Sequence, residues 1–232
     1  MLRPLLRPLL VLALLGCSGR EGSPAARAAD AATLHPAATA APVVGATDSL
    51  LAKADAGRIL GSATARVWLI IISDFQCPYC RSWHEESWAA IRKDYVDTGK
   101  LRVAYVNLPL SMHRNAYPAA QVAMCAAVQG KFWPVQDALF NTQQDWKDAA
   151  DPNPTFEALA RDAGVNADTL RACVTSAAMR PLIEADGERA AKAGASSTPT
   201  FFIGGRMLLG AQPLSVFREA IDAALAAPPA GK

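Results

Sequence analysis

The chain has 232 residues, of which 51% are hydrophobic, and its formal net charge is +2. This length and hydrophobic content are enough for one domain with a core of its own and appendages at its ends. The nearly balanced charge provides no basic face for nucleic acid, and no stretch after residue 17 is apolar enough to span a membrane.

The first residues have the pattern of an export signal. Arg3 and Arg7 form a basic region, and the apolar region that follows ends in Leu-Leu-Gly-Cys17. This ending resembles the lipobox of bacterial lipoproteins, although Leu15 is bulkier than the small residue that is usual there. The resemblance implies a lipoprotein signal peptide over residues 1–16 and lipidation of Cys17.

This segment has two other interpretations. Residues 26–28, Ala-Arg-Ala, fit an ordinary signal-peptidase site but lie far beyond the apolar region, and an uncleaved transmembrane helix needs about 20 apolar residues. Removal of residues 1–16 takes Arg3 and Arg7 with it, so 23 − 2 = 21 basic residues face 21 acidic ones. Four cysteines besides Cys17 remain in the exported domain, and an even number there favours disulfides.

The segment after the signal is predicted to be a flexible tether, residues 17–47. Residues 18–45 contain no aromatic side chain and no sustained apolar period. The folded domain is expected over residues 48–232. Residues 48–61 lead into it as a short helix or a short strand, and the sequence pattern does not decide between the two.

The first part of the domain has the pattern of strand, helix and strand. Residues 66–73 are a continuous apolar, β-branched run, typical of a strand buried on both faces. A helix is expected from Pro78 to about Thr98, with Gly99 as its stop, and a second strand over residues 101–108. This order predicts a parallel βαβ unit.

Residues from about 112 to 193 are expected to form an all-helical insertion. The segment is alanine-rich and helically periodic, and it is interrupted at Gly130, residues 151–154, Gly164 and residues 179–181. These interruptions predict four or five helices.

The chain then returns to strands. Gly194 is expected to follow the end of the last inserted helix. Residues 200–203 and 206–209 are predicted to form a hairpin, because the Gly204-Gly205 pair between them suits a two-residue turn. A final amphipathic helix is expected from Leu214 to Ala226.

The motif Cys77-Pro78-Tyr79-Cys80 stands where the first strand passes into the long helix. The free N–H groups and the dipole of the first helical turn favour a thiolate on Cys77, which lowers its pKa below about 8.5. We therefore expect Cys77 to be the nucleophile and Cys80, one turn further on, to be the resolving thiol.

The order of these elements resembles the thioredoxin fold, an α/β architecture of a βαβ and a ββα unit. With the helical insertion, it resembles the DsbA-like thiol-disulfide oxidoreductases. The residues that carry this resemblance are Phe75, Cys77, Pro78, Cys80, Gly130-Lys-Phe-Trp133, Ala138-Leu-Phe140 and Thr198-Pro199-Thr200. It covers about residues 58–226.

The resemblance also assigns roles outside the CxxC motif. In this family the proline at the position of Pro199 is cis and packs against the active-site disulfide, and the backbone of Thr198 would pair with an extended substrate peptide. The alternative is an ordinary trans proline that opens a strand. Several members have a second disulfide in the insertion, which implies a structural bond between Cys125 and Cys173. The alternative is two buried free thiols.

Two departures from the family pattern bear on the chemistry. The buried acid that is often found six residues before the first cysteine is Ile71 here, and the nearest acid, Asp74, is at least as easily read as a structural or capping residue. The proton relay of the family is therefore in doubt. Tyr79 is neutral, so it adds no positive charge, and we expect the Cys77 thiol to be acidic without being extreme.

Other candidate site residues are weaker. His84 is expected to be a surface or packing residue, and His113 to make a local structural hydrogen bond. A zinc site on Cys77 and Cys80 would need two further ligands, which the sequence does not supply at a convincing spacing. No bound cofactor is expected.

These features together predict a lipid-anchored thiol-disulfide oxidoreductase of the bacterial cell envelope, with the choice between inner and outer membrane left open. Its expected partners are cysteine-containing exported proteins and a membrane redox protein resembling the quinone-linked DsbB. Oxidase activity is the main hypothesis. A reductase or isomerase of the same fold, supplied with electrons by a membrane protein, is the first alternative, and a non-catalytic lipoprotein that holds a partner is the second.

Overall fold

The computed structural model describes residues 46–228. The expected signal peptide, Cys17 and nearly all of the expected tether lie outside this range. Helix α1 begins at Ala46, so the last two residues assigned to the tether are already helical. Within residues 46–228, no helix has both the length and the apolar character needed to cross a membrane.

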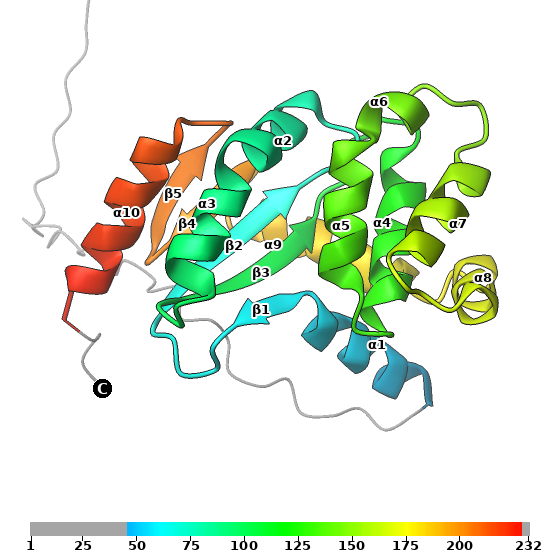
Figure 1. The fold of residues 1–232 in the computed structure, drawn as a ribbon, viewed down its shortest axis with the longest axis horizontal. Helices are drawn as coiled ribbons and strands as arrows, with labels where there is room; N and C mark the ends of the chain where they lie inside the picture. Colours follow the sequence, from blue (N-terminus) through cyan, green and yellow to red (C-terminus); the bar gives the residue numbers. More distant parts are fainter. Residues whose placement is uncertain (1–45, 229–232) are drawn as a thin grey trace, which may run out of the picture. The chain divides into compact units, whose positions relative to one another are not determined.

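Helices and strands follow each other along the described residues in a single order (Figure 1). They are α1 (Ala46–Gly57), β1 (Ile59–Gly61), β2 (Val67–Ser73), α2 (Pro78–Trp83), the π-helix η1 (His84–Trp88), α3 (Ala89–Ile91), the π-helix η2 (Arg92–Val96), β3 (Leu101–Asn107), α4 (Ala116–Ala127), α5 (Phe132–Asn141), α6 (Gln143–Trp146), α7 (Asn153–Asp162), α8 (Ala167–Thr175), α9 (Arg180–Lys192), β4 (Thr200–Ile203), β5 (Arg206–Leu209) and α10 (Leu214–Ala226).

The strands form one mixed sheet in the order β1-β3-β2-β4-β5. The central strand β2 runs parallel to β3 and antiparallel to β4, and β1 and β5 form the two edges. The last three residues of β2 are all buried, which accounts for the continuous apolar run in the sequence. The predicted parallel βαβ unit is confirmed, and its central strand delivers the chain to the CxxC motif.

The connection between β2 and β3 is one helical run from Pro78 to Val96 in which two π-helical stretches interrupt the α-helix. It ends before Gly99, whose φ of +74° is one that glycine adopts readily. The predicted helix is therefore confirmed in extent. The π-helical stretches, which are rare in proteins, have no counterpart in the sequence pattern.

Aromatic packing joins this helix to the sheet and to α10. The centroid of the Trp83 ring lies 4.6 Å from that of the Phe201 ring in β4 and 5.6 Å from that of the Phe217 ring in α10. Figure 1 shows α2, α3 and α10 on one face of the sheet and α9 on the other. All four tryptophans of residues 83–146 are at most 6% exposed, so they belong to the core.

The boundary of the helical insertion differs from the prediction. The described chain has six helices between β3 and β4, one more than the upper number of five that was expected. The extra helix is the single turn α6. The last of the six, α9, packs on β3, and its Ala190 belongs to the same buried hydrophobic cluster as Ile72 of β2. Helix α9 is thus a layer of the thioredoxin core, and α4 to α8 form the insertion.

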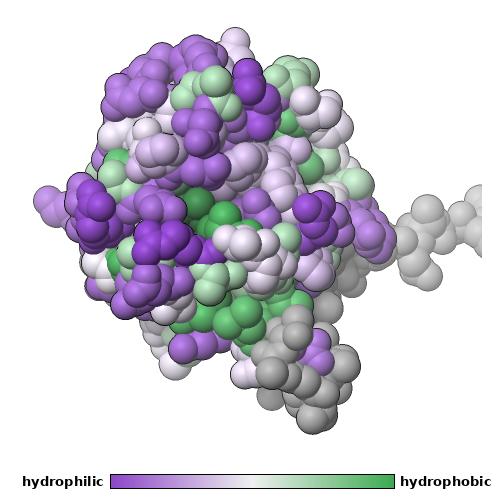
Figure 2. Space-filling view, turned by 90° about the vertical axis from the view of Figure 1, so that its right-hand side faces the viewer, coloured by the Kyte–Doolittle hydropathy of each residue, from purple (hydrophilic) through white to green (hydrophobic). Residues whose placement is uncertain are grey.

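Helix α4 is the centre of the insertion. Nine of its twelve residues are buried, and six of these are alanines, which lets α1, α5 and α8 pack closely against it. Figure 2 shows the side of the molecule that carries α7 and α8, where hydrophilic residues surround a smaller hydrophobic area. A recess of about 210 Å³ lies between α4, α7 and α8.

Several local predictions are confirmed at the residue level. The β4–β5 hairpin turns at Gly204 and Gly205, both with positive φ, and α10 spans Leu214–Ala226 as expected. Gly194 follows α9 with a φ of +81°. The undecided residues 48–61 form both elements, because α1 is followed directly by β1.

Candidate active site

The CxxC motif lies at the junction of β2 and α2. Cys77 is the N-cap residue of α2 with an extended backbone, and Pro78 takes the first helical position, where no backbone N–H is needed. Cys77 and Cys80 are both free thiols and are 3% and 1% exposed. The two thiols are therefore held just below the surface, one helical turn apart.

The turn between β2 and α2 is organised by the buried carboxylate of Asp74. Its Oδ1 accepts the backbone N–H groups of Gln76 at 2.7 Å and Cys77 at 3.2 Å, and its Oδ2 accepts the backbone N–H of Leu110 at 2.8 Å. The ring Nδ1 of His113 lies 2.8 Å from the same oxygen. Asp74 thus has a structural role, one of the roles that the sequence left open, and His113 is its local partner.

The insertion also holds this turn. The side-chain amide of Gln143 in α6 donates to the carbonyls of Phe75 at 2.7 Å and Cys77 at 3.0 Å, and it is fully buried. The Gln76 amide donates to the carbonyl of Lys147 and accepts the backbone N–H of Asn115. The motif is thereby fixed to the insertion as well as to the sheet.

The Thr198–Pro199 peptide bond is cis, as the family resemblance implied. It directly precedes β4, which pairs with β2. The Cys77 sulfur lies 3.5 Å from the carbonyl oxygen of Thr198, and Thr198 is 8% exposed. The structure therefore brings Cys77, Cys80, Thr198 and Pro199 together from two ends of the domain that are 118 to 122 residues apart in sequence.

Cys77 is the more acidic of the two thiols. Its pKa falls from an ordinary value of 9.0 to about 6, mainly because the Cys80 thiol donates a hydrogen bond to it. Burial opposes this shift, while the Thr198 side chain and the backbone N–H groups of Tyr79 and Cys80 reinforce it. At neutral pH Cys77 is therefore mainly a thiolate, acidic without being extreme.

The pKa of Cys80 moves in the opposite direction. Burial raises it well above its ordinary value, and the neighbouring Cys77 raises it further. The pair therefore consists of one thiolate and one thiol. This is the division of roles that a nucleophilic and a resolving cysteine need.

The surface around the motif exposes two large hydrophobic side chains. Tyr79, between the cysteines, is 67% exposed, and Met112, next to His113, is 79% exposed. His84 does not belong to this surface. It is buried, it stacks on Phe140, and its Nε2 lies 2.9 Å from a carboxylate oxygen of Asp137. It is thus a packing residue, one of the two roles that the sequence left open for it.

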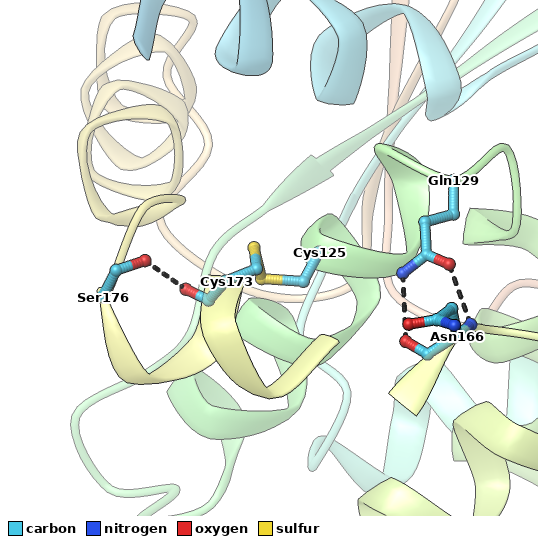
Figure 3. The surroundings of a disulfide bond; sticks show 5 residues. All are labelled: Cys125, Gln129, Asn166, Cys173 and Ser176. Carbon is cyan, nitrogen blue, oxygen red and sulfur yellow. Dashed lines mark hydrogen bonds between the residues drawn. A yellow bond between two sulfur atoms is a disulfide. The ribbon is translucent and has the colours of Figure 1, made fainter. Parts of the chain in front are cut away.

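A disulfide joins α4 and α8 between Cys125 and Cys173, the pair that the resemblance implied (Figure 3). Beside it, Gln129 and Asn166 exchange two hydrogen bonds, and the Ser176 hydroxyl donates to the carbonyl of Cys173. The bond lies in the insertion, away from the CxxC motif in sequence and in the fold.

Ile71, where the family often has an acid, is 1% exposed in the core. Among residues 46–228, no three His, Cys, Asp or Glu side chains are grouped so that they could hold a metal ion. The sequence reasoning missed Gln143, because nothing in a polar four-residue helix indicates contact with carbonyls 66 and 68 residues away.

A thioredoxin-like fold with helices on both faces of its sheet, a helical insertion, and a CxxC motif at the start of its first core helix defines the class of this protein. The chain matches the family model described as "Thioredoxin" over residues 53–223 and belongs to that family. The structure of BdbD from Bacillus subtilis has the same fold, with a TM-score of 0.67 and 22% identity, over 73% of this chain and 94% of that one.

Two curated relatives show different degrees of coverage. Disulfide bond formation protein D of Bacillus subtilis is 21% identical over 169 residues, which are 71% of this chain and 75% of that protein. The Na(+)/H(+) antiporter NhaA 3 of Salinispora tropica is 29% identical over 202 residues, which are 84% of this chain. This chain spans only 30% of the antiporter's length, so the likeness concerns one part of that protein.

Proposed function

We propose that this protein is a thiol-disulfide oxidoreductase of the bacterial cell envelope that exchanges a Cys77–Cys80 disulfide with cysteines of exported proteins. The single observation that carries this proposal is the placement of two free thiols in the first turn of α2, with the Cys77 sulfur 3.5 Å from the carbonyl oxygen of Thr198, which precedes the cis proline. The lowered pKa of Cys77 and the raised pKa of Cys80 agree with it. The likeness to a disulfide bond formation protein over most of both chains supports it.

In the oxidising direction a client thiolate attacks the Cys77 sulfur of the closed disulfide. The Cys77–Cys80 bond breaks, a mixed disulfide forms between the client and Cys77, and the electron pair passes to the Cys80 sulfur. A second client thiolate then attacks the client sulfur of the mixed disulfide. The client leaves with a new disulfide, and Cys77 departs as a thiolate while Cys80 takes up a proton.

The acidity of Cys77 favours this direction. A thiol of low pKa is a good leaving group, and a stabilised thiolate makes the reduced form more stable, so the disulfide is more oxidising. The reduced protein would pass its two electrons to a membrane redox partner similar to the quinone-linked DsbB. Pro199 and the backbone of Thr198 would hold the client strand beside Cys77.

The same proposal includes the anchor. Lipidation of Cys17 after removal of residues 1–16, together with the tether, would hold the redox domain close to a membrane. Metabolic labelling with a radioactive fatty acid in a bacterial host tests this. Label on the parent chain and none on the Cys17→Ser variant is expected, whereas an unlabelled parent chain would contradict the anchor and leave the redox proposal untouched.

The experiment that tests the function is the reduction potential of the Cys77–Cys80 couple, equilibrated against glutathione and measured by the mass shift on alkylation. With Cys77 less acidic than the DsbA thiol of pKa about 3.5 and more acidic than the thioredoxin thiol of pKa about 7, a value between about −120 and −270 mV is expected. A value at or below the thioredoxin figure would favour a reductase, and a bond that never exchanges would leave a non-catalytic scaffold.

A further inference from the structure

Tyr105 carries a buried hydroxyl group whose neighbouring polar side chain in this face of the sheet is that of Ser73. The residue lies in β3 and is fully buried, and its Oη makes no hydrogen bond of ordinary length and angle in the reduced protein. Its ring stacks on the Phe75 ring, with 5.1 Å between the ring centroids, and it packs against the Phe132 ring, with 5.2 Å between the centroids. A phenylalanine would make the same ring contacts without a buried unpaired polar group.

The position of Tyr105 relates it to the CxxC motif. In the β2–β3 register it lies beside Ile71, so the two side chains share the sheet face that α2 covers. Ser73 follows two residues later on the same face of β2 and is 3% exposed. The phenol is therefore placed under the first turn of α2, where Cys80 is buried.

The titration of these groups agrees with this placement. Burial raises the pKa of the Tyr105 phenol well above its ordinary value, a charge on Cys80 raises it further, and the Ser73 side chain lowers it. The pKa of Cys80 is raised by burial and by Cys77, and it is lowered by the Asp74 backbone and the Ser73 side chain. These influences agree with the place of Ser73 on the buried face of β2, two residues after Ile71, the register partner of Tyr105. The Asp74 carboxylate already accepts from three backbone N–H groups and His113.

We propose that the two buried hydroxyls stabilise the thiolate that forms on Cys80 when the Cys77–Cys80 disulfide opens. Ser73 donates to the Cys80 sulfur, and Tyr105, as a positioning residue, donates to the Ser73 oxygen. The inference rests on the proposed function, because it concerns the same bond. In that step the incoming sulfur bonds to Cys77, the Cys77–Cys80 bond breaks, and the electron pair moves to Cys80 without a proton transfer.

The weakly partnered hydroxyl has a physical explanation under this proposal. The contact of Tyr105 with Ser73 is poor in the resting state and strengthens when negative charge on Cys80 draws the Ser73 hydroxyl toward the sulfur, so its interaction energy lowers the barrier of the step. No acidic side chain lies beside Cys80 at the position of Ile71, and neutral hydroxyls supply the stabilisation instead.

The test distinguishes the reactions of Cys77 and Cys80 because they occur one after the other. The reduced chain carrying Cys17→Ser, with its Cys125–Cys173 bond kept closed and checked by mass, is mixed with excess 5,5′-dithiobis(2-nitrobenzoate) in a stopped-flow instrument. The first release of coloured thiolate reports attack by Cys77 on the reagent. The second, which does not depend on reagent concentration, reports attack by Cys80 on the mixed disulfide.

We expect Ser73→Ala and Tyr105→Phe to slow the second release and leave the first unchanged. Loss of a hydrogen bond to the Cys80 thiolate raises the pKa of Cys80 and lowers its thiolate fraction by about tenfold. The more basic thiolate is about threefold more nucleophilic, so a net slowing of about threefold is expected. Because the hydroxyls act in series, the double variant should be no slower than Ser73→Ala.

The matched control is Tyr117→Phe, which removes another buried phenol hydroxyl without a hydrogen-bond partner, in α4. The pKa of this phenol is shifted by burial and by the charges of Arg180 and Glu184, and by no cysteine. Both of its releases should match the parent. An unchanged second release in Ser73→Ala and Tyr105→Phe would overturn the inference, as would equal slowing of both releases, which indicates a loosened site. A parent chain without any first release would instead overturn the proposed function, and this inference with it.

Discussion

The Asp74 carboxylate ties the backbone of Cys77 to the ring of His113. Its Oδ1 lies 3.2 Å from the Cys77 nitrogen, and its Oδ2 lies 2.8 Å from Nδ1 of His113. The first residue of the CxxC motif is thus fixed by a side chain from the loop after β3. Because the carboxylate is completely buried, each of these hydrogen bonds is protected from competition by water.

The first prediction concerns this carboxylate. Asp74→Asn keeps the shape but removes the charge and turns one acceptor into a donor that faces the Leu110 N–H. We expect the free energy of unfolding to fall by about 3 kcal/mol, since hydrogen bonds to a charged group contribute about 1.5–3 kcal/mol each. Urea unfolding of the reduced protein measures it.

The control is Asp137→Asn, which alters the partly exposed carboxylate that pairs with His84. Its effect should stay below about 1 kcal/mol, as for other solvent-accessible ion pairs. If both variants lost the same stability, Asp74 would have no special part in fixing the turn.

Short-range patterns in the sequence predicted the elements that depend on them. The β4–β5 hairpin follows from Gly204-Gly205, and the central strand β2 from its unbroken apolar run. Helix α6 and its Gln143 were not predicted, because their importance comes from carbonyls on a distant turn. The assignment of α9 to the insertion failed for a similar reason, since an alanine-rich helix looks the same whether it packs on helices or on a sheet.

The chemistry of the site divides in the same way. The direction of the Cys77 pKa shift was predictable, because the start of a helix favours a thiolate. Its largest cause, the hydrogen bond from the Cys80 thiol, was not part of that prediction. The role proposed for Ser73 and Tyr105 was not predictable, because the two residues belong to different strands, and only the β2–β3 register places them on one face of the sheet. From the sequence alone, Ile71 showed only that an acid was missing.

The second prediction concerns the disulfide between α4 and α8. Replacing Cys125 and Cys173 by alanine opens a loop with a sequence separation of 48 residues. The chain-entropy model gives a loss of about 4 kcal/mol for a loop of this size, which lowers the melting temperature by about 10 °C in a protein of this length. Calorimetry of a Cys77→Ala/Cys80→Ala variant, with its Cys125–Cys173 bond first closed and then opened by a reductant, isolates the cross-link in the same way, and equal melting temperatures of the two forms would show that the cross-link contributes nothing.

The third prediction compares two glycines. A Cβ added at Gly57, at the end of α1, would stand 2.3 Å from the carbonyl oxygen of Ala127, so the α1–α4 contact has to open. Gly57→Ala should therefore cost about 1–3 kcal/mol. Gly187 lies inside α9 with open space around it, and Gly187→Ala should stabilise the protein by about 0.5–1 kcal/mol. The two variants should differ in sign in denaturant unfolding, and a common sign would contradict the packing of α1 on α4.

The last prediction concerns how the stability of the reduced protein depends on pH. The pKa of Cys77 is about 6 in the folded protein and has an ordinary value of 9.0. For a lowered pKa, the stabilisation is fully present above the ordinary value and is lost as the pH falls through the folded value. The disulfide form has no thiolate, so the melting temperature of the reduced form minus that of the oxidised form should rise steadily from pH 5 to pH 8.

Two features make this measurement specific. Other titrating groups are common to both redox forms and largely cancel in the difference, and the raised pKa of Cys80 keeps it a thiol over this range. Reduced Cys77→Ala, measured against the same oxidised parent, should lose the rise, because it has no thiolate to stabilise. A difference that stays flat between pH 5 and pH 8 in the parent chain would mean that Cys77 remains protonated, and the basis for an oxidising couple would then be gone.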